Sequence, residues 1–374
     1  MPAPSAPTFW NASRRWLQQA RAASRNDVHA ALAARRPGLR ELAALLSPAA
    51  AAELELLARH AATLTRRQFG ATVSLYVPLY LSNHCSGGCA YCGFAADRAQ
   101  PRLKLTRTQL VAELDALHAM GFEDLLLLTG ESSRQAGFPY LLECAAAAAE
   151  KVHRVSVESF AMSRAQYRKL FQAGCTGVTL YQETYNPAVY RRMHRWGPKR
   201  NFAHRLHAPE RALAAGMHSL GMGALLGLSD PLQEALSVFQ HLRHLQTRHW
   251  QAEYSISFPR LQRETGGFTA PYPVADRQLA QMIFAFRICL PTVPLVLSTR
   301  ESAAFRDGIA GLGISKMSVA SRTTVGGYRT QAPRGDGQFS VNDTRDLAAF
   351  CRQLKKKGLR PVFKNWDASL RVRG

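Results

Sequence analysis

The sequence predicts an α/β protein, a parallel (β/α)8 barrel of TIM type with an N-terminal helical segment and a short C-terminal extension. Segments rich in β-branched and aromatic residues alternate with segments of helical periodicity through about eight units. Polar or charged residues follow each predicted strand, and in a parallel barrel such loops converge on one face. A doubly wound sheet also alternates, but it does not explain those strand ends. We expect a helical segment over 1–70, the barrel over 71–320 and the extension over 321–374.

The predicted elements follow one another in this order. Helical periodicity in the first 70 residues is broken at Pro37 and Pro48. The barrel strands are expected over 72–83, 123–131, 152–159, 177–185, 219–228, 253–260, 295–301 and 314–323. The helices between them are expected over 106–121, 163–174, 208–216 and 231–248, and near 139–150, 274–288 and 301–309. Thr106 or Thr108 caps the first of these helices, and Gly121 ends it. Beyond about residue 320 the chain is loop-rich, then adds a last helix and the sequence PVFKNWD.

The composition is that of an ordinary globular protein with a strong basic excess. Hydrophobic residues make up 47% and charged residues 20%, but the formal net charge is +22. The basic residues are scattered in pairs such as Arg14/Arg15 and Arg35/Arg36, without a nucleic-acid-binding motif. We therefore expect no nucleic-acid partner and interpret the charge as favouring solubility and acidic protein partners.

The N-terminal sequence and the cysteines indicate the compartment. ASRRWLQQARAASR is amphipathic and basic and lacks the apolar run of a signal peptide, and no apolar run is long enough to span a bilayer. A transit peptide is the weaker alternative, because the Arg/Ala bias runs through the whole chain. We expect a cytoplasmic protein with no membrane partner. Four of the seven cysteines are isolated and are expected to be core residues, namely Cys144, Cys175, Cys289 and Cys351.

Three cysteines lie close together in SNHCSGGCAYCGF, directly after the first predicted barrel strand. Cys85, Cys89 and Cys92 have no second cysteine pair with zinc-ribbon spacing, and a disulfide would leave one thiol unpaired. His84 is adjacent to Cys85, and adjacent residues rarely face one metal together. Thiolates are the natural ligands of iron–sulfur clusters, and the glycines let the backbone wrap a bulky cluster. The loop therefore favours a 4Fe-4S cluster with three cysteine ligands and one open iron.

The CxxxCxxC spacing, with Tyr91 before the last cysteine and a position after the first barrel strand, resembles radical S-adenosylmethionine (SAM) enzymes. The resemblance implies that SAM chelates the open iron and is cleaved to methionine and a 5′-deoxyadenosyl radical. Thr129, Gly130 and Glu131 match the family motif that holds the SAM amino group. A simple turn with an exposed glutamate is the alternative for that motif.

Within this superfamily the chain resembles the 2-iminoacetate synthases of thiamine biosynthesis. The resemblance covers nearly the whole chain from about residue 40, through blocks such as GFEDLLLLTGE, GVTLYQETY, MGALLGLSD, LSTRESAAFRD, QFS and PVFKNWD. It implies a lyase that cleaves the Cα–Cβ bond of L-tyrosine to 2-iminoacetate and p-cresol. It also implies two partners, a thiazole synthase that accepts 2-iminoacetate and a flavodoxin or ferredoxin electron donor. Because such donors are usually acidic, the basic surplus would favour their docking.

The same resemblance assigns residues at the strand ends. Arg300 matches the arginine that takes the substrate carboxylate, and Tyr80 and Ser321 match substrate-contacting positions of the related tryptophan lyase. Glu183 and Glu158 are candidate partners for SAM or the substrate amine, and Arg260 adds positive charge on the same face. The alternatives are structural: Arg300 in a surface turn, Tyr80 as a core aromatic and Glu158 paired with a rim arginine.

The sequence also departs from the family pattern and leaves rivals open. Ala161-Met162 replaces a common Pro-Leu, which should loosen that loop without removing a chemical group. Cys351 is the only cysteine after the predicted barrel, so we expect no second cluster like that of the hydrogenase-maturation lyases. The rival functions are a tryptophan-lyase type of radical SAM enzyme and, from another class, a basic nucleic-acid-binding or zinc-structural protein.

Overall fold

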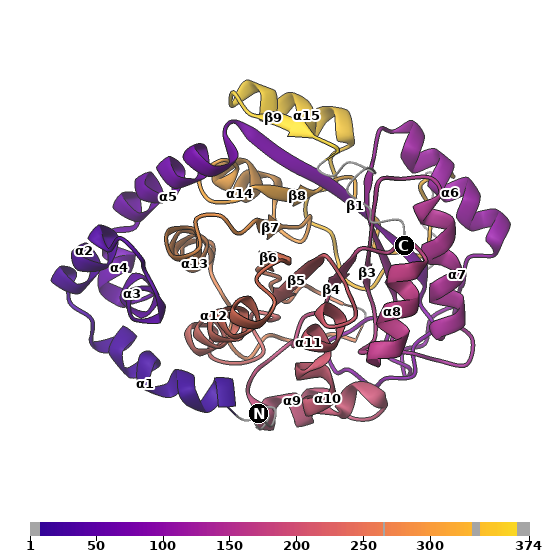
Figure 1. Cartoon of the computed structure of the whole chain (residues 1–374), viewed down its shortest axis with the longest axis horizontal. Coiled ribbons are helices and arrows are strands. Elements are labelled where there is room, and N and C mark those ends of the chain that lie inside the picture. Colours follow the sequence, from indigo (N-terminus) through magenta and orange to yellow (C-terminus); the bar gives the residue numbers. More distant parts are fainter. Residues whose placement is uncertain (1–7, 265, 331–336, 365–374) are drawn as a thin grey trace.

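The computed structural model describes residues 8–264, 266–330 and 337–364, and eight parallel strands form a closed barrel in it. Each strand pairs with the next in chain order, and β1 pairs with both β2 and β8 to close the ring. The barrel strands are β1 (Thr72–Ser82), β2 (Asp124–Thr129), β3 (Arg154–Glu158), β4 (Gly177–Thr179), β5 (Ser219–Gly223), β6 (Glu253–Ser257), β7 (Leu295–Leu297) and β8 (Lys316–Ser318). The predicted barrel is therefore confirmed (Figure 1).

Helices surround the barrel, and apart from α9 and α10 they follow the order that the sequence predicts. Those that follow the strands include α6 (Arg107–Ala119), α7 (Phe138–Ala149), α8 (Arg164–Gln172), α9 (Pro187–Met193), α10 (Phe202–Leu206), α11 (Ala208–Leu213), α12 (Pro231–Arg248), α13 (Asp276–Cys289) and α14 (Ala303–Ile309). Thr106 is the N-cap of α6, with its hydroxyl accepting from the Gln109 N–H, so the first of the two candidate caps is the correct one. Gly121 ends the helix in a left-handed conformation.

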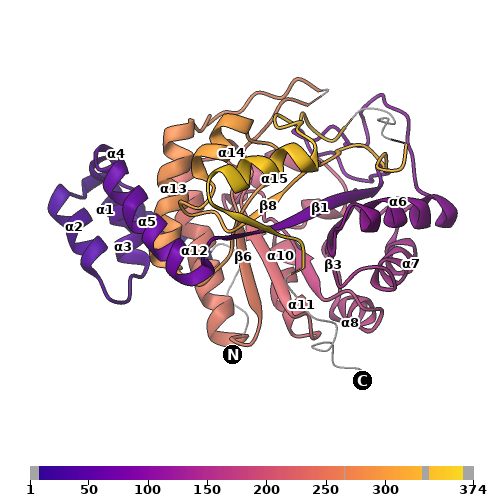
Figure 2. The ribbon, with the colours of Figure 1, turned by 90° about the horizontal axis from the view of Figure 1, so that it is seen from above.

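Five helices form a separate layer on one side of the barrel, opposite α6–α8 (Figure 2). They are α1 (Thr8–Ala22), α2 (Arg25–Ala33), α3 (Leu39–Leu45), α4 (Pro48–Ala52) and α5 (Leu54–Phe69). Buried glutamines fasten the layer, because the Gln233 amide donates to the Trp10 carbonyl and the Gln281 amide to the Leu45 carbonyl. Among the described residues, no helix combines the length and apolar character needed to cross a membrane.

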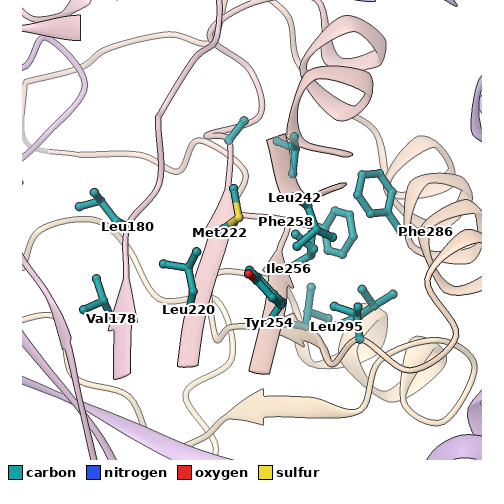
Figure 3. Packing of buried hydrophobic residues seen from close by; sticks show 14 of the residues in the cluster. Val178, Leu180, Leu220, Met222, Leu242, Tyr254, Ile256, Phe258, Phe286 and Leu295 are labelled. Atoms are coloured by element: carbon teal, nitrogen blue, oxygen red, sulfur yellow. The ribbon is translucent and has the colours of Figure 1, made fainter. Parts of the chain in front are cut away.

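Successive side chains of a strand point alternately to the outer core, between the sheet and the helices, and to the barrel interior. Val77, Leu79 and Leu81 of β1 belong to the main core between sheet and helices, whereas Tyr76 and Tyr80 belong to an inner cluster with Leu126 and Leu128 of β2. Figure 3 shows the outer core beside β4–β7, where the Phe258 and Phe286 rings meet edge to face with centroids 5.2 Å apart. Even-numbered side chains of β1 therefore reach the barrel interior.

Some elements differ from the prediction. The expected strand over 177–185 ends at Thr179, and Glu183 lies beyond it with a φ of 70°, a conformation that non-glycine residues rarely adopt. The helices α9 and α10, and the turn of 3-10 helix η1 (Pro198–Arg200) between them, were not predicted. The extension contains α15 (Leu347–Lys356) and also β9 (Arg360–Val362), which pairs with the start of β1. The division at residues 70 and 320 stays a prediction, and most of KNWD lies outside the described residues.

Candidate active site

The loop that carries the three cysteines begins at the C-terminal end of β1, and the Arg102 side chain holds its backbone. The Arg102 guanidinium donates to the backbone carbonyls of Asn83 and Phe94, both at 2.8 Å, and to that of Ala95. A guanidinium can bind several carbonyl oxygens at once because it has five N–H donors in a rigid fork. The loop conformation is thus fixed by a residue that the sequence analysis did not single out.

The cysteine side chains fit a cluster bound by thiolates. All three are free thiols, and a Cβ added to Gly87 would lie 3.7 Å from the Cys85 sulfur and 3.9 Å from the Cys89 sulfur, so both sulfurs lie beside the same glycine. Burial raises the pKa of the Cys89 thiol to about 12, so this thiol stays protonated unless a metal displaces the proton. The described residues hold no group of three His, Cys, Asp or Glu side chains suited to one metal ion, and a four-iron cluster needs none, because each thiolate binds a different iron.

The Thr129-Gly130-Glu131 turn lies directly against the cysteine loop. The Glu131 N–H points at the Cys85 sulfur at 3.3 Å, an arrangement that stabilises a metal-bound thiolate. A Cβ at Gly130 would come within 2.5 Å of the His84 carbonyl oxygen, so only glycine allows this approach. Glu131 is buried rather than exposed, which distinguishes the turn from a surface loop.

The segment with α9 and α10 covers the other side of the cysteine loop and supplies residues that sequence reasoning missed. His194 is fully buried, and its Nε2 atom lies 2.8 Å from the Tyr91 hydroxyl. Lys199 donates to the Glu183 carboxylate at 2.6 Å, and Arg205 approaches the same oxygen at 3.4 Å. Burial alone would raise the pKa of Glu183, but these two cations outweigh it and hold the pKa below its usual range.

A cavity at the C-terminal end of the barrel has two lobes that share five lining residues, namely Glu158, Tyr181, Pro259, Arg300 and Phe339. The inner lobe lies among the barrel strands and also contains Tyr80, Ser321 and apolar side chains of β2 and β7. The outer lobe contains Cys92, Tyr91, Glu183 and Lys199. The structure therefore gathers Arg300, Tyr80, Ser321, Glu158, Glu183 and Tyr91 around one cavity next to a cysteine sulfur.

Arg300 and Glu158 are the charged groups at the junction of the lobes. The Arg300 guanidinium stacks on Phe339, 3.3 Å from the ring centroid, and it forms no ion pair with a carboxylate of the described residues. Burial raises the pKa of Glu158 to about 7, although Arg300, Arg205 and Lys199 oppose the shift. The Glu158 carboxyl group likewise has no hydrogen bond or ion pair within the described ranges, so it is not paired with a rim arginine there.

Arg260, in contrast, is already paired. It forms ion pairs with Glu301 and with Asp276, the latter at 2.8 Å, and it donates to the Val274 carbonyl. Glu301 is 1% exposed, so this pair anchors the loop that presents Arg300. The loop of Ala161 and Met162 is also held, since the Met162 carbonyl accepts from Arg211 at 2.9 Å.

Two family models match the chain in succession. That of the radical SAM superfamily matches residues 79–239, and that of the Biotin and Thiamin Synthesis associated domain matches residues 257–360. The 2-iminoacetate synthase of Escherichia coli (strain K12) is 44% identical over 345 residues, which are 92% of this chain and 91% of that protein. The chain belongs to the 2-iminoacetate synthase family of radical SAM enzymes.

Two further similar proteins support the assignment to this family. The 2-iminoacetate synthase of Salmonella typhimurium is 42% identical over the same shares of both chains. The crystal structure of HydG, a maturase of the [FeFe]-hydrogenase, matches with a TM-score of 0.89 at 30% identity and covers 95% of this chain and 80% of that chain. Membership of the 2-iminoacetate synthase family confirms the predicted barrel and the predicted cofactors, a 4Fe-4S cluster and SAM.

Proposed function

We propose that this chain is the radical SAM lyase that cleaves the Cα–Cβ bond of L-tyrosine to 2-iminoacetate and p-cresol. The observation that carries the proposal is the 44% identity to a 2-iminoacetate synthase over 92% of the chain. The cavity supports it, because a basic group and a carboxyl group lie together beside a cysteine sulfur. When bound through Cys85, Cys89 and Cys92, the cluster and SAM supply the radical that removes a hydrogen atom from the substrate.

In this proposal Thr129, Gly130 and Glu131 hold the SAM amino group. Glu131 is suited to accept from a cationic amine because it is buried, and its own backbone N–H already faces Cys85. Tyr91 shapes the outer lobe and is fixed by His194. Glu183 faces the same lobe, and its two cationic partners keep it charged and oriented rather than free to take a proton.

The substrate would lie across the junction of the two lobes. Arg300 takes the tyrosine carboxylate in a bidentate hydrogen bond, since its guanidinium is held flat by Phe339 and has no competing carboxylate in the described residues. The phenol ring then enters the inner lobe beside Tyr80 and Ser321, among the apolar side chains of β2 and β7. This pose directs the amino group toward Glu158 and the outer lobe, where positioning next to SAM is what the reaction requires.

Glu158 gives this pose a pH dependence. Its pKa is raised to about 7, so the carboxylate that accepts from the substrate ammonium is present above pH 7 and is lost as the pH falls through 7. We expect kcat/KM for tyrosine to fall from pH 8 to pH 6. Glu158→Gln is expected to lower kcat/KM about 10-fold at pH 8, as the loss of one charged hydrogen bond predicts, and to remove this acid limb. An unchanged acid limb in Glu158→Gln would assign it to another group.

We propose that an acidic flavodoxin- or ferredoxin-type donor docks beside Trp196. Trp196 is 40% exposed, its ring packs on Gly88 between two of the cysteines, and Arg195 stacks on it 4.5 Å from the ring centroid. Arg191 and Arg192, which are exposed, lie in the last turn of α9.

Cluster reduction by such a donor is therefore expected to slow steeply as ionic strength rises. At low ionic strength, replacing Arg191 and Arg192 by glutamine should slow cluster reduction by the donor. Arg243→Gln, on the exposed face of α12, should leave that rate unchanged. Stopped-flow measurement of cluster reduction across a salt series tests this, and a flat response would count against the surface.

Two finer assignments belong to the same proposal. A thiazole synthase would accept 2-iminoacetate directly, a role supported by the match to the Biotin and Thiamin Synthesis associated domain. A cytoplasmic location agrees with the seven free cysteine thiols.

The activity is tested by anaerobic incubation of the reconstituted protein with SAM and dithionite, and with either L-tyrosine or L-tryptophan. We expect p-cresol with tyrosine only. Absence of p-cresol with tyrosine would contradict the proposed function.

A further inference from the structure

Gln338 connects a cysteine of the cluster loop to the inner lobe of the cavity. The Tyr80 hydroxyl donates to Gln338 Oε1 at 2.8 Å, and Gln338 Nε2 donates to the Cys92 sulfur at 3.5 Å. Among the described residues, no other side chain donates a hydrogen bond to any of the three cysteine sulfurs; the remaining donors to them are the backbone N–H groups of Gly87 and Glu131.

The chemistry of a metal-bound cysteine fixes the orientation of this amide. A thiolate ligand has no proton and can only accept, so the amide NH2 must face the sulfur. The amide oxygen is then left to face Tyr80, whose hydroxyl is able to donate. The two hydrogen bonds therefore reinforce each other, because donation by Tyr80 to the oxygen polarises the amide and strengthens its N–H bond to sulfur.

The backbone around Gln338 is anchored on both sides, so the amide is held in place. Its N–H donates to the Thr323 carbonyl at 3.0 Å, and its carbonyl accepts from the Gly93 N–H at 3.1 Å. A Cβ at Gly93 would lie 2.7 Å from that carbonyl oxygen, so glycine directly after Cys92 is what permits the contact. The segment is fixed to the loop after β8 and to the cysteine loop at once.

We propose that Gln338 is a positioning residue that raises the reduction potential of the cluster through its N–H bond to Cys92 and ties that potential to Tyr80. Hydrogen bonds to cluster sulfurs stabilise the added negative charge of the reduced state and so raise the potential. The inference rests on the proposed function for the presence of the cluster, but it concerns a property that is measured without turnover.

The test is a redox titration of the reconstituted cluster, followed by electron paramagnetic resonance without substrate. Gln338→Leu removes both hydrogen bonds, Gln338→Glu keeps the acceptor for Tyr80 but replaces the N–H donor by a negative charge, and Tyr80→Phe removes only the polarising hydroxyl. Gln262→Leu is the matched control, because Gln262 lines the same cavity but bonds Asn342 at 2.9 Å.

We expect the highest potential in the wild type and Gln262→Leu, a more negative one in Tyr80→Phe, a still more negative one in Gln338→Leu and the lowest in Gln338→Glu. Iron content per chain is measured first, and if Gln338→Leu does not retain its cluster, the order of the wild type, Tyr80→Phe and Gln338→Glu decides. A normal cluster with the wild-type potential in the Gln338 variants, or an equal shift in Gln262→Leu, would overturn the inference. A wild-type protein that forms no cluster would instead contradict the proposed function.

Discussion

Replacement of Arg300 by methionine is expected to lower kcat/KM for L-tyrosine by about 100-fold, mainly by raising KM. The guanidinium stacks on Phe339 and has no carboxylate partner among the described residues, so the substrate carboxylate is its proposed partner. A hydrogen bond to a charged group contributes about 1.5–3 kcal/mol, and loss of about 3 kcal/mol corresponds to roughly 100-fold. Arg300→Lys keeps the charge but loses the planar fork, so its loss should be intermediate.

The same substitution should also change the pH profile. Arg300 opposes the rise in the pKa of Glu158, so Arg300→Met is expected to move the acid limb of kcat/KM to a pH above 7. Arg243→Met, on the exposed face of α12, is the control. Steady-state kinetics from pH 6 to pH 9 measure both effects, and a kcat/KM within about threefold of wild type would show that Arg300 does not bind the substrate.

Replacement of Cys92 by alanine is expected to abolish the cluster and, with it, all turnover. The other two sulfurs lie beside Gly87, and two thiolates leave a second iron without a protein ligand. Cys351→Ala is the matched control, since Cys351 is a free, half-buried thiol on α15. Iron content and the visible absorption of the anaerobically reconstituted proteins are the measurements. A Cys92→Ala protein with the iron content and absorption of wild type would disprove cluster ligation by these three cysteines.

Local sequence was sufficient to predict most of the barrel. The helix predicted over 231–248 has the observed bounds of α12, and the structure shows that Asp230 caps its N-terminus. The strand ending at Thr179 was overextended because LYQETY has the composition of a strand, whereas the chain turns at Glu183. β9 was missed because three residues carry no periodicity, and only its long-range pairing with β1 makes them a strand.

Site residues were predicted where they lie at or just after the end of a predicted strand. Site residues were missed where only tertiary packing brings them to the site. Cys92 and Arg300 lie in loops after strands and Glu158 ends β3, so their convergence on one cavity could be expected. Lys199, Arg205 and His194 lie in a segment of short helices whose packing on the cysteine loop has no local signal. Gln338 follows the strands by about twenty residues, and nothing near it in the sequence connects it to Cys92.

Carbon tracing in L-tyrosine tests most directly which bond the protein breaks. Tyrosine labelled with ¹³C at Cα or at Cβ is incubated anaerobically with SAM and dithionite, and the products are analysed by mass spectrometry. Cleavage between Cα and Cβ predicts that the Cβ label appears in the methyl group of p-cresol and that the Cα label appears in 2-iminoacetate or its hydrolysis product. A Cα label that stays with the aromatic fragment would contradict the lyase assignment.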